Sequence, residues 1–537
     1  MQPLTIDSPR PTRSPLRIVA LISVLYAALF ISAVNTTIVT TALPTIATHF
    51  NSTSGYTWVG AAYVLADTAS GPVWTNFSDI WGRKIVFLAA IILFMLSSFI
   101  CGFAVSMGML IAGRALQGAA AGAIMLLVNI VISDMFDMRR RTLYLGVCDV
   151  IWAVAGAVGP VIGGAFAEYA GWRWIWYTNI PIAAVTFLVV CLFMDVHNPQ
   201  TPIWRGLKAV DWLGSLALLA VTIMTLLGLN IGGQYMQWTS PKVLVLIVVG
   251  LAFALVFYLI EARVARYPVM PVQVFRSRSN AATIAVGALH AFAMMGPEYY
   301  LPLYFQSAQL AQPLQSGLLG LPFVFLEGIG GIASALLIHQ TGRYNALLWA
   351  GACLMTLGFG LLIDLQPSTG LAKIIIYQCI GALGSGLLIQ PPMVAIQANV
   401  SQQETATATS TLTFMRGLAQ AVSIVVGGVV FQSSMDIKQS ALAEAGLPHD
   451  LVVTFSGNEA QVTVSQLRGI PDVAQQQAVQ MAYAWSLRNA WILYAGVAGL
   501  AIGASLFVGR HALSTEHEET RTGIHHGDDD KTTPAVP

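Results

Sequence analysis

Four carboxyl groups and one imidazole interrupt stretches of the chain that are otherwise apolar. They are Asp67, Asp149, Glu298, Glu327 and His290. An ionisable side chain in the hydrocarbon core of a bilayer is costly and therefore marks a functional site by default. Burial disfavours the charged form of a carboxyl group, so both protonation states come within reach, and a histidine can titrate near neutral pH. These residues could bind and release protons.

Their positions within the apolar stretches rank these acids. Asp67 and Glu327 lie closest to the middle of their stretches and are the first candidates to carry a proton. Asp149 lies near the end of its stretch, where an ion pair with Arg139–Arg141 is the alternative explanation. For Glu298 a functional and a structural role are equally compatible with the sequence.

A guanidinium group also lies within an apolar segment, at Arg114 of GRALQG. Burying it costs about 2.5–3.5 kcal/mol on insertion scales, so it must face a polar partner or a wet cavity. The alternative is that the long side chain reaches the membrane interface. Other side chains could line a cavity for an amphipathic substrate, although each aromatic one could equally face lipid. These are Asn35, Gln117, Phe292, Tyr299 and Tyr300.

Two further segments have compositions suited to conformational change. In TNFSDIWGRK an acid, a glycine turn and two bases, Asp79, Gly82, Arg83 and Lys84, occupy one tight loop. Such a loop can lock two helices with a charge-assisted pair that breaks when they move, or can simply anchor the loop in the cytoplasm. The stretch 146–164 is rich in small residues, which permit close helix contact and bending. Its later part carries Gly159, Pro160, Gly163 and Gly164.

The composition predicts that membrane-spanning helices position all of these residues. Of the 537 residues, 56% are hydrophobic and only 9% are charged, whereas soluble domains average about 25% charged. About fourteen apolar segments have the ~20 residues needed to cross a bilayer. We therefore expect an all-α polytopic membrane protein. The predicted parts are an N-terminal tail (1–16), a six-helix bundle (17–194), a linker (195–210), two inserted helices (211–260), a second six-helix bundle (261–509) with an extracellular loop (432–487), and a C-terminal tail (510–537).

The charge distribution predicts the orientation. Lys and Arg are about three times as frequent in the loops on the side of the N-terminus as on the other side, which favours cytoplasmic N- and C-termini. All five cysteines lie in apolar segments, so a disulfide framework is not expected. A net charge of +1 with dispersed basic residues gives no indication of nucleic-acid binding. Asn51 begins an NST glycosylation sequon on the outer side, where its closeness to the membrane disfavours use.

Together these motifs resemble those of the major facilitator superfamily, in its fourteen-span drug:proton antiporter branch and in the style of fungal members. Asp79–Lys84 matches the loop motif between helices 2 and 3, and Arg114 with Gln117 and Gly118 matches the helix-4 motif. Gly146, Gly156, Gly159–Pro160 and Gly163–Gly164 match the helix-5 antiporter motif. Further similar segments are WRWIWYTNIP (172–181) and YYLPLYFQ (299–306).

The resemblance implies two six-helix bundles around a midplane cavity, and alternating access by rocking of the bundles. In the family, the helix-5 motif marks exporters and the helix-4 arginine is tied to proton coupling. The chain departs from the family pattern at two positions: Asn35 stands where the branch commonly has an aspartate, and Thr75 replaces the usual opening glycine of the loop motif. If proton coupling persists, one of the other buried acids must carry it.

The predicted function is therefore export of an amphipathic drug, toxin or secondary metabolite in exchange for protons. Proton-coupled import of a nutrient or metal chelate is the alternative, and a membrane-embedded enzyme is a remote one because no HExxH or catalytic cluster is present. The chain contains no GxxxxGK[ST] loop, so ATP is not expected to drive transport directly. We expect a monomer without cofactor or metal, in the cell membrane or an internal membrane.

Overall fold

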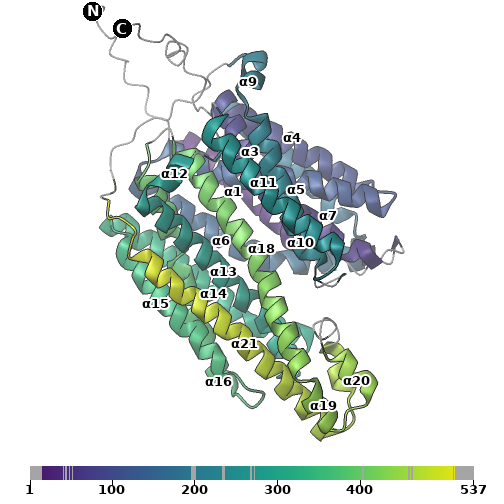
Figure 1. The fold of residues 1–537 in the computed structure, drawn as a ribbon. Coiled ribbons are helices and arrows are strands. Elements are labelled where there is room, and N and C mark those ends of the chain that lie inside the picture. The colour runs from purple at the N-terminus through teal and green to yellow at the C-terminus, as the bar shows by residue number, and fades with distance from the viewer. Residues whose placement is uncertain are drawn as a thin grey trace, which may run out of the picture.

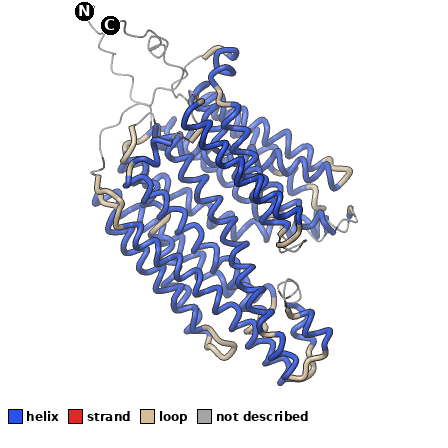
Figure 2. The backbone as a smooth tube through the Cα atoms, viewed as in Figure 1, coloured by secondary structure: helices blue, strands red, loops and turns tan. Residues whose placement is uncertain are grey.

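The computed structural model describes residues 15–39, 42, 45–46, 49–50, 53–194, 201–232, 236, 238–265, 269–270, 272–401, 404–456, 460, 464–511 and 513. Within these ranges the chain is helical and contains no strand, which confirms the all-α fold (Figure 2). Asn51 lies outside the described residues, as do most of the two predicted tails and residues 195–200 of the predicted linker.

The first half of the chain forms six long helical segments and a short surface helix. They are α1 (Pro15–Thr37), α3 (Thr53–Trp81), α4 (Arg83–Gly102), α5 (Met107–Met135), α6 (Met138–Ala165) continued by the π-helical η1 (Phe166–Ala170), α7 (Trp174–Tyr177) followed by α8 (Asn179–Phe193), and α9 (Ile203–Ala209). Side chains cap several starts: Ser106 accepts a hydrogen bond from Met109 N, and Asp137 accepts from Arg139 N and Arg140 N. Such caps satisfy backbone donors that have no partner within the helix.

The second half begins with two helices, α10 (Trp212–Ile231) and α11 (Pro241–Arg263). The rest are α12 (Val272–Arg276), α13 (Arg278–Ser307), α14 (Pro313–Thr341), α15 (Asn345–Leu361) with η2 (Leu362–Asp364), α16 (Leu371–Leu387), α17 (Gln390–Ala398), α18 (Thr405–Ile437), α19 (Gln439–Glu444), α20 (His449–Thr454), η5 (Val464–Gly469) and α21 (Val473–Ser505). At the end of α14, Gly342 has φ 66°, a left-handed conformation that glycine adopts without steric cost.

Twelve segments among the described residues are long and apolar enough to cross a membrane. Two long helices, α3 and α13, are not among these twelve, and both are less apolar: α3 carries Asp67, Asn76 and Asp79, and α13 carries Glu298 and two prolines. The finding confirms a polytopic membrane protein, whereas the count of fourteen spans stays a prediction.

The buried apolar side chains form separate cores in the two halves. One core contains Leu25, Phe87 and Phe94 with other residues of α1 to α8, and a larger one contains Tyr304, Phe359 and other residues of α13 to α21. In Figure 1 these groups occupy the upper right and the lower left of the view. The first core also includes Ile284, Met393 and Leu412, which lie near the start of α13, in α17 and near the start of α18. The halves are therefore packed together at the end that the charge count predicts to be cytoplasmic.

The two inserted helices differ in their surroundings. Helix α11 is almost entirely exposed, as expected for a peripheral helix. Helix α10 packs against both α3 and α18, one from each half (Figure 1). Leu218 of α10 is buried against Phe414 of α18, whereas Leu213 and Leu216 of the same helix are exposed.

The predicted extracellular loop over 432–487 is shorter in the structure. Helix α18 continues to Ile437 and α21 already begins at Val473, and α19, α20 and η5 lie between them. Polar composition suggested a long loop, but apolar residues of these three short helices, Leu442, Val452 and Leu467, are buried in the core of the second half. Burial of one apolar face is sufficient to hold such short helices in place.

Candidate transport cavity and its ionisable groups

A cavity of about 1090 Å³ lies between the two halves. Residues of α1, α3, α5 and α6 line it on one side, residues of α13, α14, α17 and α18 on the other, and α10 contributes Leu226 and Leu229. The size suits a drug-sized ligand. Its charged lining residues are Asp67, Asp149, Glu298, Glu327 and Arg416. All four acids predicted from the sequence thus meet in one cavity.

Glu298 of α13 and Glu327 of α14 both line the cavity, and their carboxyl groups lie close enough to interact. Two negative charges side by side repel strongly in a medium of low dielectric constant. A single proton held between the two carboxyl groups removes this repulsion, because a protonated carboxyl can donate a hydrogen bond to an ionised one. The pair could therefore hold one proton.

A polar chain continues from this carboxyl pair into the second half. Ser385 Oγ of α16 donates a 2.7 Å hydrogen bond to Glu327 Oε1. The ring nitrogen Nε2 of His290 lies 3.0 Å from Ser385 O and 3.1 Å from Ser385 Oγ. A Cβ at Gly386 would overlap the Glu327 carbonyl, so this glycine permits the close contact between α16 and α14 that brings Ser385 to Glu327. His290 is fully buried behind the cavity wall rather than in it.

Asp149 connects the first half to this network. Its Oδ2 accepts a 2.6 Å hydrogen bond from Gln390 Nε2 of α17. Arg416 of α18 interacts electrostatically with both Asp149 and Glu327 and is the one cation among the cavity-lining residues described. The alternative ion pair between Asp149 and Arg139–Arg141 is wrong, because the Arg141 side chain instead contacts Ser133 O and those residues lie at the end of the bundle.

Asp67 lines the opposite wall of the cavity without such partners. Its Oδ1 atom is buried and has no hydrogen-bond partner among the residues described. Gly122 of α5 packs directly on the Asp67 backbone, and Gly118 packs in the same way on that of Tyr63. These glycines, four residues apart, let α5 approach α3 closely.

Arg114 lies within this close α3–α5 contact and is fully buried. Its guanidinium donates to Val59 O (3.1 Å), Asn35 O (3.1 Å) and Gln117 Oε1 (2.7 Å) and lies 4.1 Å from the centre of the Tyr63 ring. Each of these groups is neutral, so carbonyl dipoles and a ring face stabilise the charge. The alternative that Arg114 reaches the membrane interface is wrong.

The predicted cavity residues fall into two groups. Tyr299 and Tyr300 line the cavity. Asn35 and Gln117 do not, because both are fully buried in the Arg114 network, where Asn35 and Asn179 exchange hydrogen bonds of 2.9 and 3.0 Å. Phe292 packs against Tyr494 in the core of the second half. Hydrophobicity alone could not separate the residues of a cavity wall from those of a core.

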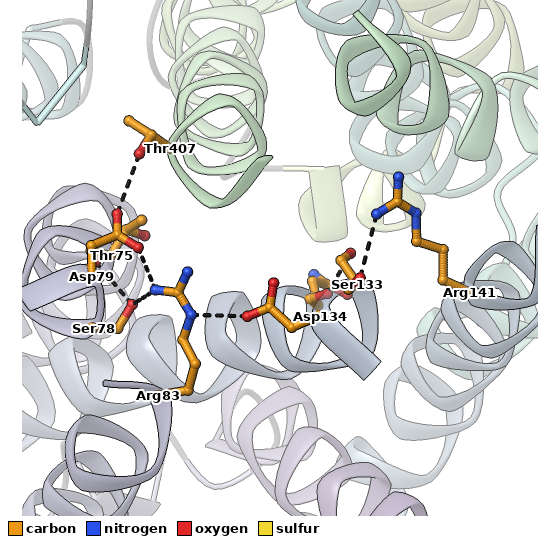
Figure 3. A network of polar contacts seen from close by, with 9 residues as sticks. Thr75, Ser78, Asp79, Arg83, Ser133, Asp134, Arg141 and Thr407 are labelled. Atoms are coloured by element: carbon orange, nitrogen blue, oxygen red, sulfur yellow. Dashed lines mark hydrogen bonds and ion pairs between the residues drawn. The ribbon is translucent and has the colours of Figure 1, made fainter. Parts of the chain in front are cut away.

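The loop motif forms a buried ion-pair network (Figure 3). Arg83 is fully buried, pairs with Asp79, and donates to Asp134 Oδ2 (3.0 Å) and Ser78 Oγ (2.6 Å). The turn before it needs Gly82, whose φ is 90°. Lys84 lies outside the network and donates a 2.7 Å hydrogen bond to the exposed Cys191 carbonyl.

Among the residues that the structure describes, three hydrogen bonds join the halves at this end of the bundle. Thr407 Oγ1 donates to Asp79 Oδ2 (3.3 Å), and Gln397 Nε2 donates to Ser133 Oγ (3.2 Å). The His339 Nδ1 atom lies 3.0 Å from the Arg139 carbonyl. The cavity is therefore closed at the predicted cytoplasmic end.

The small-residue stretch of α6 contacts two different helices. Gly146 packs on Ala335 of α14, near the closed end. Gly159 packs on Thr37 of α1, and a Cβ there would overlap Thr37 Oγ1. Pro160, Gly163 and Gly164 follow within the same helix, which remains α-helical to Ala165. The prediction of close helix packing is thus supported at Gly146 and Gly159.

Several polar residues of the cavity wall, of the Arg114 site and of the Arg83 ion-pair network are absent from the sites predicted from the sequence. These are Arg416, Gln390, Ser385, Asn179 and Asp134. Arg416 could have been found by the same criterion as Arg114, since it is a base inside an apolar segment. For the others the sequence shows only a polar residue in a helix, and the partners are far apart in the chain.

A helical fold around a central cavity, with ionisable groups in its wall and its halves joined at one end, is typical of polytopic membrane transporters. The family model of the Major Facilitator Superfamily matches residues 25–424. The chain belongs to this superfamily.

Relatives and solved structures agree with this family. The chain is 39% identical to the efflux pump dotC of Dothistroma septosporum (strain NZE10 / CBS 128990), covering 95% of this chain and 87% of the relative. It is 39% identical to the MFS-type transporter ppz2 of Metarhizium majus, covering 97% and 90%, and 31% identical to the efflux pump FUS6 of Gibberella fujikuroi, covering 90% and 87%. The proton:xylose symporter XylE shares the fold at a TM-score of 0.57 and 12% identity, covering 93% of this chain and 98% of that one.

Proposed function

We propose that this transporter exports amphipathic small molecules by alternating access and takes up protons in exchange. The observation that carries the proposal is the adjacent pair of carboxyl groups, Glu298 and Glu327, in the wall of a mostly apolar cavity. These carboxyl groups can hold a proton in one conformation of the transporter and release it in another. The efflux pumps to which the chain is similar support the direction of transport.

The coupling follows from the position of the pair next to Arg416. Loss of the shared proton leaves two carboxylates that repel one another, and Arg416 or a bound substrate can compensate this charge. The cavity is acidic, with four carboxyl groups and one guanidinium among the lining residues described. Binding of a proton therefore reduces the net negative charge of the cavity wall. A substrate that interacts with the same carboxyl groups competes with the proton for them.

We propose that the closed end faces the cytoplasm, with both termini on that side, so that the structure represents an outward-facing state. The basic residues around Arg83 and Arg139–Arg141 support this orientation through the positive-inside rule. Breaking the Asp79–Thr407 and Ser133–Gln397 contacts would then accompany opening toward the cytoplasm. In this proposal the protein resides in the plasma membrane.

Export of a fluorescent amphipathic dye tests the proposal. Cells of a pump-deficient yeast that express the protein should release the preloaded dye faster than cells with an empty vector. Collapse of the proton gradient with a protonophore should remove the difference. Dye accumulation in the expressing cells would indicate import and contradict the proposal, and release that is insensitive to the protonophore would exclude proton coupling.

A further inference from the structure

The two seams between the halves are not equivalent. On the seam between α3 and α18, helix α10 packs against both helices. Near its start it contacts α3 through Trp212 and Phe77 and buries Leu218 against Phe414 of α18, and near its end Leu229 lines the cavity. The cavity is thus separated from the bilayer on this side.

The other seam, between α6 and α14, has no such cover among the described helices, and its contacts stop halfway. From the closed end outward, Gly146 contacts Ala335, Asp149 approaches Gly331, and the Ala153 Cβ lies 3.8 Å from where a Cβ on Gly328 would be. Further outward along both helices, the contacts between them end. Side chains added at Gly156, Gly317 or Gly320 would meet no atom within 4 Å, although all three residues line the cavity.

The packing of α6 explains this separation. Beyond Ala153 the helix turns its small residues toward α1: Thr37 Oγ1 donates to the Ala155 carbonyl (3.2 Å), and Gly159 is in direct contact with Thr37. A helix whose outer part is held on α1 cannot also follow α14. The open positions are bordered by exposed apolar side chains of Trp152 and Val324, which also line the cavity.

We propose that the cavity opens sideways between the outer parts of α6 and α14, and that amphipathic substrates pass through this opening into the adjacent leaflet of the bilayer. This inference rests on the proposed export function for its direction. An opening lined by glycine and apolar side chains presents no hydrogen-bonding groups that lipid would leave unsatisfied. A substrate that prefers the membrane can then leave the cavity without crossing water.

Photolabelling with a lipid tests the opening without requiring transport. The probe is phosphatidylcholine with a diazirine on the acyl chain, in vesicles containing the purified protein. The five native cysteines are replaced, and a short bis-thiol crosslink between Ser133→Cys and Gln397→Cys holds the closed end shut. The readout is acyl-chain labelling of Met125, which lines the cavity from α5, a helix with most of its surface buried.

Met125 should be labelled in the crosslinked protein, and Gly320→Trp should reduce that labelling at least fivefold by filling the opening. The control is Gly360→Trp on α15, where an added side chain also meets no atom within 4 Å but which does not line the cavity. Absent labelling of Met125, or equal labelling in Gly320→Trp and Gly360→Trp, would overturn the sideways opening. If Met125 is not labelled but the dye is exported, the sideways opening is overturned and the export proposal stands. If Met125 is labelled but no dye is exported, the export proposal is overturned and the opening stands.

Discussion

Asp149 accepts a 2.6 Å hydrogen bond from Gln390, and this bond joins α6 of the first half to α17 of the second at the wall of the cavity. Both residues lie deeper than the contacts at the closed end, and Arg416 is within electrostatic reach of Asp149. Asp149, for which the sequence suggested an ion pair with Arg139–Arg141, is instead a contact between the two halves of the protein.

Gln390→Ala should weaken the closed state. A hydrogen bond to a charged group contributes about 1.5–3 kcal/mol, so its loss should shift the conformational equilibrium by roughly tenfold or more. The yield of crosslinking between Ser133→Cys and Gln397→Cys measures this closure. Gln378→Ala is the matched control, because Gln378 is equally buried but bonds only within its own helix, to Ile374 O. Equal yields in the two variants would contradict a role for the Asp149–Gln390 contact.

Arg83→Ala should destabilise the fold and abolish export. It leaves Asp134 and Asp79 without their buried cation, and breaking a buried ion pair costs about 3–5 kcal/mol. Thermal unfolding in detergent measures the loss. Lys84→Ala removes the neighbouring charge, which is half-buried and donates to the Cys191 carbonyl outside the ion-pair network, and should leave the unfolding temperature within error of the wild type. If the two variants unfold at the same temperature, the buried network does not stabilise the loop.

Arg114→Ala should abolish export while the protein still reaches the membrane. The substitution leaves the Val59 and Asn35 carbonyls and the Gln117 amide without their shared donor in a buried site. Arg114→Lys should restore little, because an ammonium group lacks the planar fork that reaches three acceptors. Export in cells, normalised to surface expression, measures the effect. Export at the wild-type rate by Arg114→Lys would contradict the need for the guanidinium geometry and show that a positive charge at this position is sufficient.

Asn35→Asp should make export sensitive to pH. Asn35 donates to both Asn179 Oδ1 and Ile31 O through Nδ2. A protonated aspartic acid can still donate to Asn179, whereas an ionised one presents only acceptors to these oxygens. Export should therefore be close to the wild-type rate at low pH and fall as the pH rises. A pH profile parallel to that of the wild type would contradict the importance of the Asn35–Asn179 pair.

The sequence predicted which ionisable residues form the site better than it predicted which of them contact one another. Arg114, Asp79 and the four acids are ionisable groups in apolar helices, and the energetic cost of burying charge identifies such residues without a structure. No such argument reveals that Glu298 meets Glu327, because the two residues belong to different helices and their pairing depends on how α13 and α14 pack. The same reason explains the absence of Gln390 and Ser385 from the predictions.

The fold class could likewise be predicted, but not the role of α10 or of 438–472. Hydropathy identifies helices that cross a membrane and says nothing of which helix faces lipid. Leu218 of α10 has the same character as the exposed leucines of α11, yet it is buried against Phe414. Segment 438–472 is polar overall, and only the positions of Leu442 and Val452 on single helix faces lead to their burial.

Proton release driven by substrate, in vesicles containing the purified protein, tests the central claim most directly. A pH-sensitive dye inside the vesicles records proton movement when an amphipathic substrate gradient is applied. The wild type should show proton movement opposite to the substrate. Glu327→Gln and Glu298→Gln should each abolish it, because a glutamine cannot exchange the shared proton, while substrate binding to the folded protein is retained. Asp67→Asn tests the second candidate acid in the same assay. Undiminished proton movement in both glutamate variants would contradict the account.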